Sequence, residues 1–306
     1  MPKVTAPTYR SGGESVPASD AAATLEERAI ALKFLQTLAT EVSQGTVDLP
    51  CFPDVVIRIS EALADPNSTA ERVVAMVGAE PRLAARVLQT ANSAAFNSTG
   101  KPLADLRSAI TRLGHQMVQG TAMSYAMQHM KNEHSLRSIA KPLSELWNRS
   151  IAVASISKLI AQRTKVPSDE AFLTGLIHGI GKLYIMARVA SAGGGPAGEH
   201  LWIELISGWQ ASIGKAVLQS WGFAEEMCDA VGDQGDLDRK WKHEAKLVDV
   251  LIASVVLADA LQTPEPRTIC TDGINAFSSI GVTPADCAII LTEAVAQIRQ
   301  VHEALA

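Results

Sequence analysis

Apolar residues recur along most of this chain at steps of three and four, the spacing of a helix that buries one face. In the segment that begins at Leu25, one such stripe is formed by Ile30, Phe34, Leu38 and Val42. Alternating runs of β-branched residues, which would predict strands, are scarce. The pattern therefore predicts an all-α fold made of many packed helices.

Turn residues divide this pattern into separate helices. Pro, Gly and Asn interrupt the helical period at intervals, most clearly within 65–67 and 97–100. Short helices are expected between these breaks, and the longer ones are predicted over 25–43, 105–113, 116–130, 142–163, 168–189, 200–206, 212–221, 225–231, 244–261 and from 283 onward. Thr283 is the expected N-cap of the last helix, with Pro284 at its first position.

Composition and charge restrict the function. The 306 residues are 47% hydrophobic, enough for a sizeable core, and the formal net charge is −5. Basic residues form no stripe that could neutralise phosphates, so no nucleic-acid partner is expected. Apolar stretches such as 250–257 are far shorter than the roughly 20 residues that span a bilayer, so no membrane-spanning segment is expected.

The first 24 residues are polar and rich in Pro, Ser and Gly. Such a composition predicts a disordered tail, and because it contains no apolar signal-like core, a cytoplasmic location is expected. The four cysteines form no C-x-x-C pair, so neither a zinc knuckle nor a redox motif is indicated.

Several motifs in the first half stand in a recognisable order. LPCFP begins at Leu49, and ADPNS, AEPRLAARVLQTANSAAF and LRSAITRLGHQMV follow it. Their order and spacing resemble the N-terminal half of the HDOD domain, a bacterial signalling module, although Glu80 replaces the usual Asp.

The second half resembles the degenerate HD-phosphohydrolase-like core of the same family, through LWNRSIAVASISKLI, AFLTGLIHGIGKLYIM, WQASIGKAVLQSWGF and LIASVVLADAL. After the disordered tail over 1–24, we therefore expect an N-terminal helical part over 25–135 packed on a degenerate HD-like helical core over 136–264, and then a helical extension over 265–306.

An active HD phosphohydrolase holds a divalent metal with one His, an adjacent His-Asp pair and a distant Asp. The resemblance places Arg149 at the first position, His178-Gly179 at the pair and Asp259 at the last. One auxiliary His is matched by Gln210, and the match for the second is either Asp233 or Gln234. We call the set Arg149, His178, Gly179, Gln210 and Asp259 the remnant HD site.

The surviving imidazole and carboxylate make a poor site for a hard cation, and an Arg would place a fixed positive charge where the metal should lie. No metal and no cofactor are therefore expected. Asp259 continues the apolar stripe of Val248, Ile252 and Val255, so its carboxylate is expected to face the interior and to pair with Arg149. For Arg149 with Asp259, an ordinary ion pair between two helices is favoured over a ligand site, and His178 is better interpreted as a buried core histidine than as a metal ligand.

Three functions remain open at this stage. The first, which the resemblance favours, is a non-catalytic signalling module that binds an unidentified signalling protein. The second is a sensor that binds a nucleotide or another small anionic ligand at the remnant HD site. The third is a residual metal-dependent phosphohydrolase, which would require a ligand that the motifs do not show. The chain is therefore not expected to be an enzyme.

Overall fold

The computed structural model describes residues 49–305, except 66, 98–99, 192–198, 241–243, 262–270 and 272, together with a few isolated residues between 33 and 44. The predicted disordered tail over 1–24 and most of the predicted helix over 25–43 lie outside the described residues.

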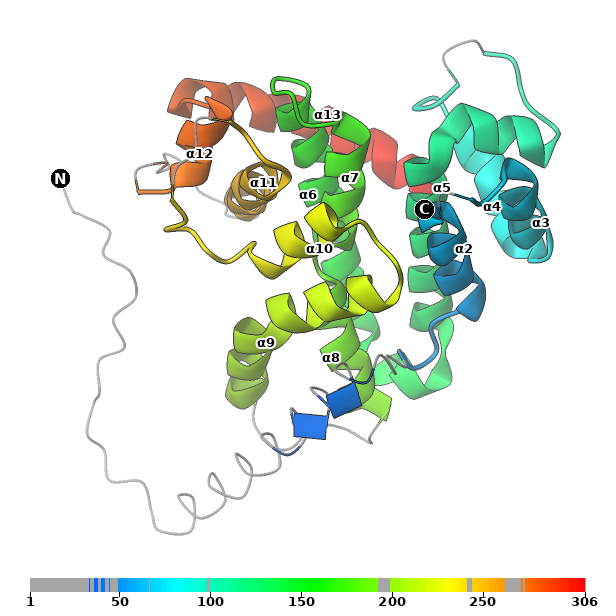
Figure 1. The fold of residues 1–306 in the computed structure, drawn as a ribbon, viewed down its shortest axis with the longest axis horizontal. Coiled ribbons are helices and arrows are strands. Elements are labelled where there is room, and N and C mark those ends of the chain that lie inside the picture. The colour runs from blue at the N-terminus through cyan, green and yellow to red at the C-terminus, as the bar shows by residue number, and fades with distance from the viewer. Residues whose placement is uncertain are drawn as a thin grey trace.

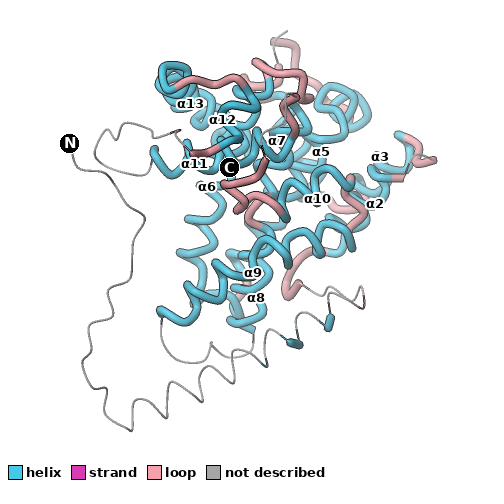
Figure 2. The backbone as a smooth tube through the Cα atoms, turned by 60° about the vertical axis from the view of Figure 1, so that its left-hand side comes forward, coloured by secondary structure: helices cyan, strands magenta, loops and turns pink. Residues whose placement is uncertain are grey.

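The described part of the chain contains helices and loops and no strand, which confirms the predicted all-α class (Figure 2). The α-helices are α2 (Asp54–Ala64), α3 (Ala70–Gly78), α4 (Pro81–Asn92), α5 (Leu106–Asn132), α6 (Ala140–Ala161), α7 (Ser168–Ile177), α8 (Ile180–Ser191), α9 (Glu199–Ser220), α10 (Glu225–Gly232), α11 (Leu247–Leu261), α12 (Asn275–Ile280) and α13 (Pro284–Leu305). A 3-10 helix, η1 (His134–Ile139), joins α5 to α6.

Two local predictions are confirmed by backbone geometry. The predicted break between 113 and 116 is present as a kink in α5 at Gly114, whose φ of 72° lies in the left-handed region that glycine tolerates. α13 begins where it was expected. The Thr283 backbone N–H donates to the Asp286 carboxylate at 2.9 Å, and the Asp286 N–H donates back to the Thr283 hydroxyl at 3.3 Å.

Two other predictions are wrong. The helix expected over 168–189 is divided into α7 and α8 by a turn at His178 and Gly179. Every residue from 171 to 181 is buried, so this stretch has no polar face whose phase could reveal the turn. Conversely, the two helices expected over 200–206 and 212–221 form the single helix α9, because a helix interior tolerates Gly208 at a cost of about 1 kcal/mol.

The N-terminal helices α2 to α5 pack on the helical core that begins at α6, and one continuous apolar cluster runs through both parts. α13 links them, running from beside α12, along α6, towards α4 and α5 (Figure 1). Its last turn is held by two buried hydroxyls. Thr90 donates to the Ala304 carbonyl at 3.2 Å, and Ser124 donates to the Leu305 carbonyl at 2.5 Å.

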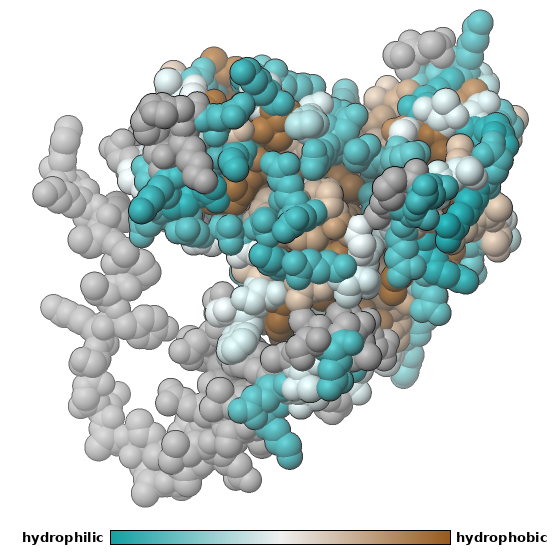
Figure 3. Space-filling model, in the orientation of Figure 1, coloured by the Kyte–Doolittle hydropathy of each residue, from teal (hydrophilic) through white to brown (hydrophobic). Residues whose placement is uncertain are grey.

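Hydrophilic residues cover much of the face in Figure 3, and hydrophobic residues gather in the recesses between helices. The most exposed large apolar side chains of the described residues are Trp209, Leu237, Ile289 and Val295. Within the described chain, no helix has both the length and the apolar character needed to cross a membrane.

Candidate functional site

The predicted pair between Arg149 and Asp259 is present. Arg149 lies on α6 and Asp259 on α11, and these two helices pack against each other. The guanidinium meets the carboxylate with both of its terminal nitrogens. Nη1 donates to Oδ1, and Nη2 donates to Oδ2 at 3.2 Å. This fork-to-fork arrangement confirms the predicted pairing of Arg149 with Asp259.

The burial of this pair differs from what its sequence pattern predicts. The Arg149 side chain is 25% exposed and the Asp259 side chain 56% exposed, so the expectation that Asp259 faces the interior is wrong. Val255, one turn earlier on α11, is itself only partly buried. The apolar stripe of α11 therefore leaves the core before it reaches Asp259, two residues before the helix ends.

His178 lies at the C-terminal end of α7, in a buried part of the site, unlike the exposed carboxylate of Asp259. Its ring is buried, and Nδ1 lies 2.7 Å from the Gly175 carbonyl oxygen, which requires an N–H at Nδ1. Burial lowers the pKa of His178 to about 4, and the nearby positive charges of Arg149 and Lys182 act in the same direction, against the Gly175 hydrogen bond. The predicted buried, hydrogen-bonded histidine is confirmed, and it is neutral at pH 7.

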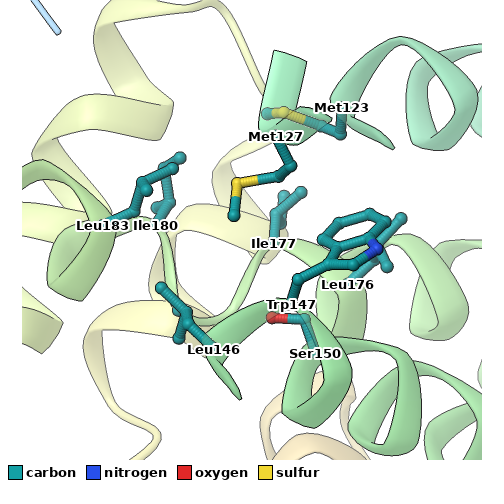
Figure 4. A pocket seen from close by; sticks show the side chains of 10 residues that line it. Met123, Met127, Leu146, Trp147, Ser150, Leu176, Ile177, Ile180 and Leu183 are labelled. Carbon is teal, nitrogen blue, oxygen red and sulfur yellow. The ribbon is translucent and has the colours of Figure 1, made fainter. Parts of the chain in front are cut away.

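Gly179 is a point of close packing. A Cβ atom at this position would lie 2.7 Å from the Leu146 side chain and 3.7 Å from the Ser150 hydroxyl. The same residues belong to an apolar cavity between α5, α6 and the turn from α7 to α8 (Figure 4). Its volume is about 20 Å³, room for roughly one water molecule. The space next to Gly179 therefore cannot accept a nucleotide in this conformation.

The structure separates the two auxiliary positions. Gln234, rather than Asp233, reaches the site, where its Nε2 donates to the His178 carbonyl at 3.1 Å and to the Val231 carbonyl at 2.8 Å. Gln210 lies on α9 and contributes its backbone carbonyl to the close contact with Gly181. Among the described residues, no interaction joins the Gln210 side chain to the rest of the remnant HD site.

Lys182 is a site residue that the sequence analysis missed. It lies one turn after His178 on α8, and burial lowers its pKa, as does the charge of Arg149, while Glu145 raises it. The available signal was a single lysine within the apolar run LIHGIGKLYIM, since lysine is rarely buried without a reason. With Lys182 included, the site contains two cationic side chains close to His178.

The donor groups do not fit a divalent metal. His178 commits one ring nitrogen to Gly175, and Asp259 commits both of its oxygens to Arg149. Across the described residues, no three His, Cys, Asp or Glu side chains are grouped so that they could share an ion. The remnant HD site thus combines a cationic edge with a buried neutral histidine, and this arrangement is suited to holding an anion or a carboxylate rather than a cation.

Comparisons with known proteins agree with this architecture. The family model of the HDOD domain matches residues 49–237, more than half of the chain. The structure of a "Putative metal-dependent phosphohydrolase" from Shewanella amazonensis SB2B superimposes with a TM-score of 0.66 at 24% identity, over 89% of this chain and 98% of that one. That of a "Putative signal transduction protein" from Marinobacter aquaeolei VT8 does so with a TM-score of 0.57 at 18% identity, over 90% of this chain and 64% of that one.

A curated protein from Treponema pallidum (strain Nichols), described as an "Uncharacterized protein", is 21% identical over 235 residues. The match covers 72% of this chain but spans less than half of that relative, 44% of its length. At these identities the two structures establish the helical fold that is shared with this chain.

Proposed function

This chain belongs to the HDOD domain family, and from that premise we propose that it is a non-catalytic signal-transduction module that acts by binding another protein. The observation that carries the proposal is the ion pair of Arg149 with Asp259. The resemblance matches Asp259 to a carboxylate with which an HD phosphohydrolase binds its metal, and here both oxygens of that carboxylate are committed to Arg149. The name of the Marinobacter neighbour, a signal transduction protein, is consistent with this role.

The packing around the site supports the same proposal. A phosphohydrolase needs an open volume in which a phosphate ester can meet a metal-bound water. Here the cavity beside Gly179 holds about 20 Å³, and the His178 ring is buried. A module that transmits a signal needs only a stable surface, which this helical array provides.

A hydrolysis assay tests the non-catalytic part. We expect p-nitrophenyl phosphate and bis(p-nitrophenyl) phosphate, with Mn²⁺ or Mg²⁺, to be hydrolysed no faster by the native chain than by the double variant His178→Asn/Asp259→Asn. Metal-stimulated turnover that the double variant abolishes would refute the proposal. Cross-linking in the native host, followed by affinity purification, should recover a specific protein that is absent from a tag-only control.

A second function is favoured by the cationic edge of the site. Burial lowers the pKa of Lys182, and the charge of Arg149 lowers it further, so a small anion held by both side chains would relieve their repulsion. We expect pyrophosphate to raise the melting temperature of the native chain but not that of Lys182→Gln. Lys141→Gln, at an exposed position on the same face of α6 as its partner Glu145, is the matched control. Equal shifts in all three proteins would exclude the site as the place of binding.

A further inference from the structure

A second and larger cavity lies away from the remnant HD site. It has a volume of about 240 Å³ and lies where the N-terminal helices meet the core. Leu63 of α2 and the part of α5 that follows the Gly114 kink form one wall. α7, the turn between α9 and α10, and the first turn of α10 form the other. Figure 1 shows these two groups of helices facing each other. We call it the seam cavity.

Gln119 is the residue of the seam cavity that calls for an explanation. Its side chain lies in the middle of α5, lines the cavity and leaves the residue only 8% exposed. None of the described residues forms a hydrogen bond with its carboxamide. Its carboxamide atoms are not among the fully buried, unpartnered polar atoms of the described residues, so they open onto the cavity, where water or a ligand can bond to them. Gln119 therefore offers both a donor and an acceptor to a molecule that enters the cavity.

The other polar groups of the seam cavity define what that partner must offer. Gln116 lies one turn before Gln119 on α5, so two carboxamides share one wall. Glu170 of α7 lies on the other wall, where burial and the charge of Glu226 raise the pKa of its carboxyl group. The described lining includes His115 but no lysine or arginine, and the carboxylate of Glu170 disfavours a phosphate.

Apolar side chains complete the lining. Phe223 and Met227 come from the α9–α10 turn and from α10, and Leu173 comes from α7. An aromatic ring and a thioether pack well against the face of a flat ring. The cavity is smaller than the roughly 300–1,000 Å³ of sites for drug-sized ligands, so a compact ring system fits its size better than a nucleotide does.

We propose that the seam cavity binds a small planar heterocycle that carries an exocyclic amino group and no phosphate, with adenine as the representative ligand. A glutamine carboxamide pairs with the N6 amino group and N7 of adenine through one donor and one acceptor, and a carboxylate accepts from an amino group. Gln119 and Glu170 would supply these contacts from opposite walls. The proposal is independent of the signalling function above, because it uses neither Arg149 nor His178.

Titration calorimetry of the full 306-residue chain with adenine tests the proposal, with unsubstituted purine as the matched ligand. Adenine should bind and raise the melting temperature, and purine, which lacks the amino group, should bind at least tenfold more weakly. Absence of adenine binding at millimolar concentration would overturn the proposal, and so would equal affinity for the two ligands.

Two variants locate the site. Gln119→Leu should fold about as stably as the native chain, because Leu is of similar size and lies at the wall of the cavity, and it should weaken adenine binding tenfold or more. Glu170→Gln preserves the shape of the side chain and should weaken binding as well, which keeps the test valid if Gln119→Leu is unstable. Gln162→Leu changes an exposed glutamine at the end of α6, outside the cavity, and should bind adenine normally. Unchanged binding in both cavity variants would place adenine elsewhere.

Discussion

The two sides of the remnant HD site are built differently. On the closed side, Gly175, Gly179 and Gly181 allow helices to touch so closely that an added Cβ atom would contact a neighbouring helix. On the open side, Arg149 and Asp259 meet where the carboxylate is 56% exposed. The stability of the closed side depends on close packing between helices, and a larger side chain there would force the helices to move. The open side depends on charge in contact with water, which can change at little cost to stability.

The largest expected effect tests the closed side at Gly181. A Cβ atom there would collide with the backbone carbonyl of Gln210, and backbone cannot move aside as a side-chain end can. Gly181→Ala should lower the free energy of unfolding by about 3 kcal/mol, measured by urea denaturation. Gly208→Ala, at an open position on α9, is the control and should be neutral or stabilising. Similar stabilities for both variants would mean that α8 and α9 are not in contact.

A slightly smaller effect is expected from the pH dependence of His178. The pKa of its buried ring is about 4, below the ordinary value of 6.5, so the unfolded chain binds more protons between these values. The free energy of unfolding should therefore fall as the pH is lowered from 6.5 towards 4, with His178 contributing at most roughly 3 kcal/mol.

His178→Asn removes this titration and retains a donor for the Gly175 carbonyl, so its stability should depend less on pH over that window. His302→Asn, at an exposed position on α13, controls for histidine titration in general. If the free energy of unfolding depended on pH in the same way for the native chain and for His178→Asn, the His178 ring would have to be accessible to protons in the folded chain.

An intermediate effect is expected where an aspartate is placed at position 179, which the family resemblance matches to a metal ligand. Gly179→Asp should place a carboxylate against Leu146 in an apolar cavity, and we expect a loss of about 2 kcal/mol in urea denaturation. Gly179→Ala isolates the steric part of that loss. The combination Arg149→His/Gly179→Asp would again supply all four ligand types. Tight Mn²⁺ binding by this double variant, measured by calorimetry, would show that the close packing around position 179 can rearrange to admit a metal ion.

The smallest effect is expected on the open side. Arg149→Ala should lower the free energy of unfolding by about 1 kcal/mol or less, because the pair is solvated at Asp259. A double-mutant cycle with Asp259→Ala should give a coupling energy of similar size. A coupling of several kcal/mol would mean that the pair behaves as a buried one, and the contrast between the two sides would disappear.

Much of this architecture could be predicted from the order of residues alone. The helical period predicted the all-α class and a break between 113 and 116, where α5 is kinked, and Thr283 with Pro284 predicted the start of α13. The motif match predicted the contact between Arg149 and Asp259, although 110 residues separate them along the chain. These features depend on local backbone preferences or on a family pattern, and the sequence contains both.

Other features were decided only by tertiary packing. The turn between α7 and α8 lies in a stretch that is buried on all sides, where periodicity carries no information. The exposure of Asp259, the approach of Lys182 to Arg149 and the choice of Gln234 over Asp233 depend on how α6, α8, α10 and α11 meet. The opening of the Gln119 carboxamide onto the seam cavity was decided in the same way, since the neighbours of a side chain come from segments that are distant in sequence. Local sequence therefore determined which helices form, and the contacts between those helices decided which side chains reach water, one another or a cavity.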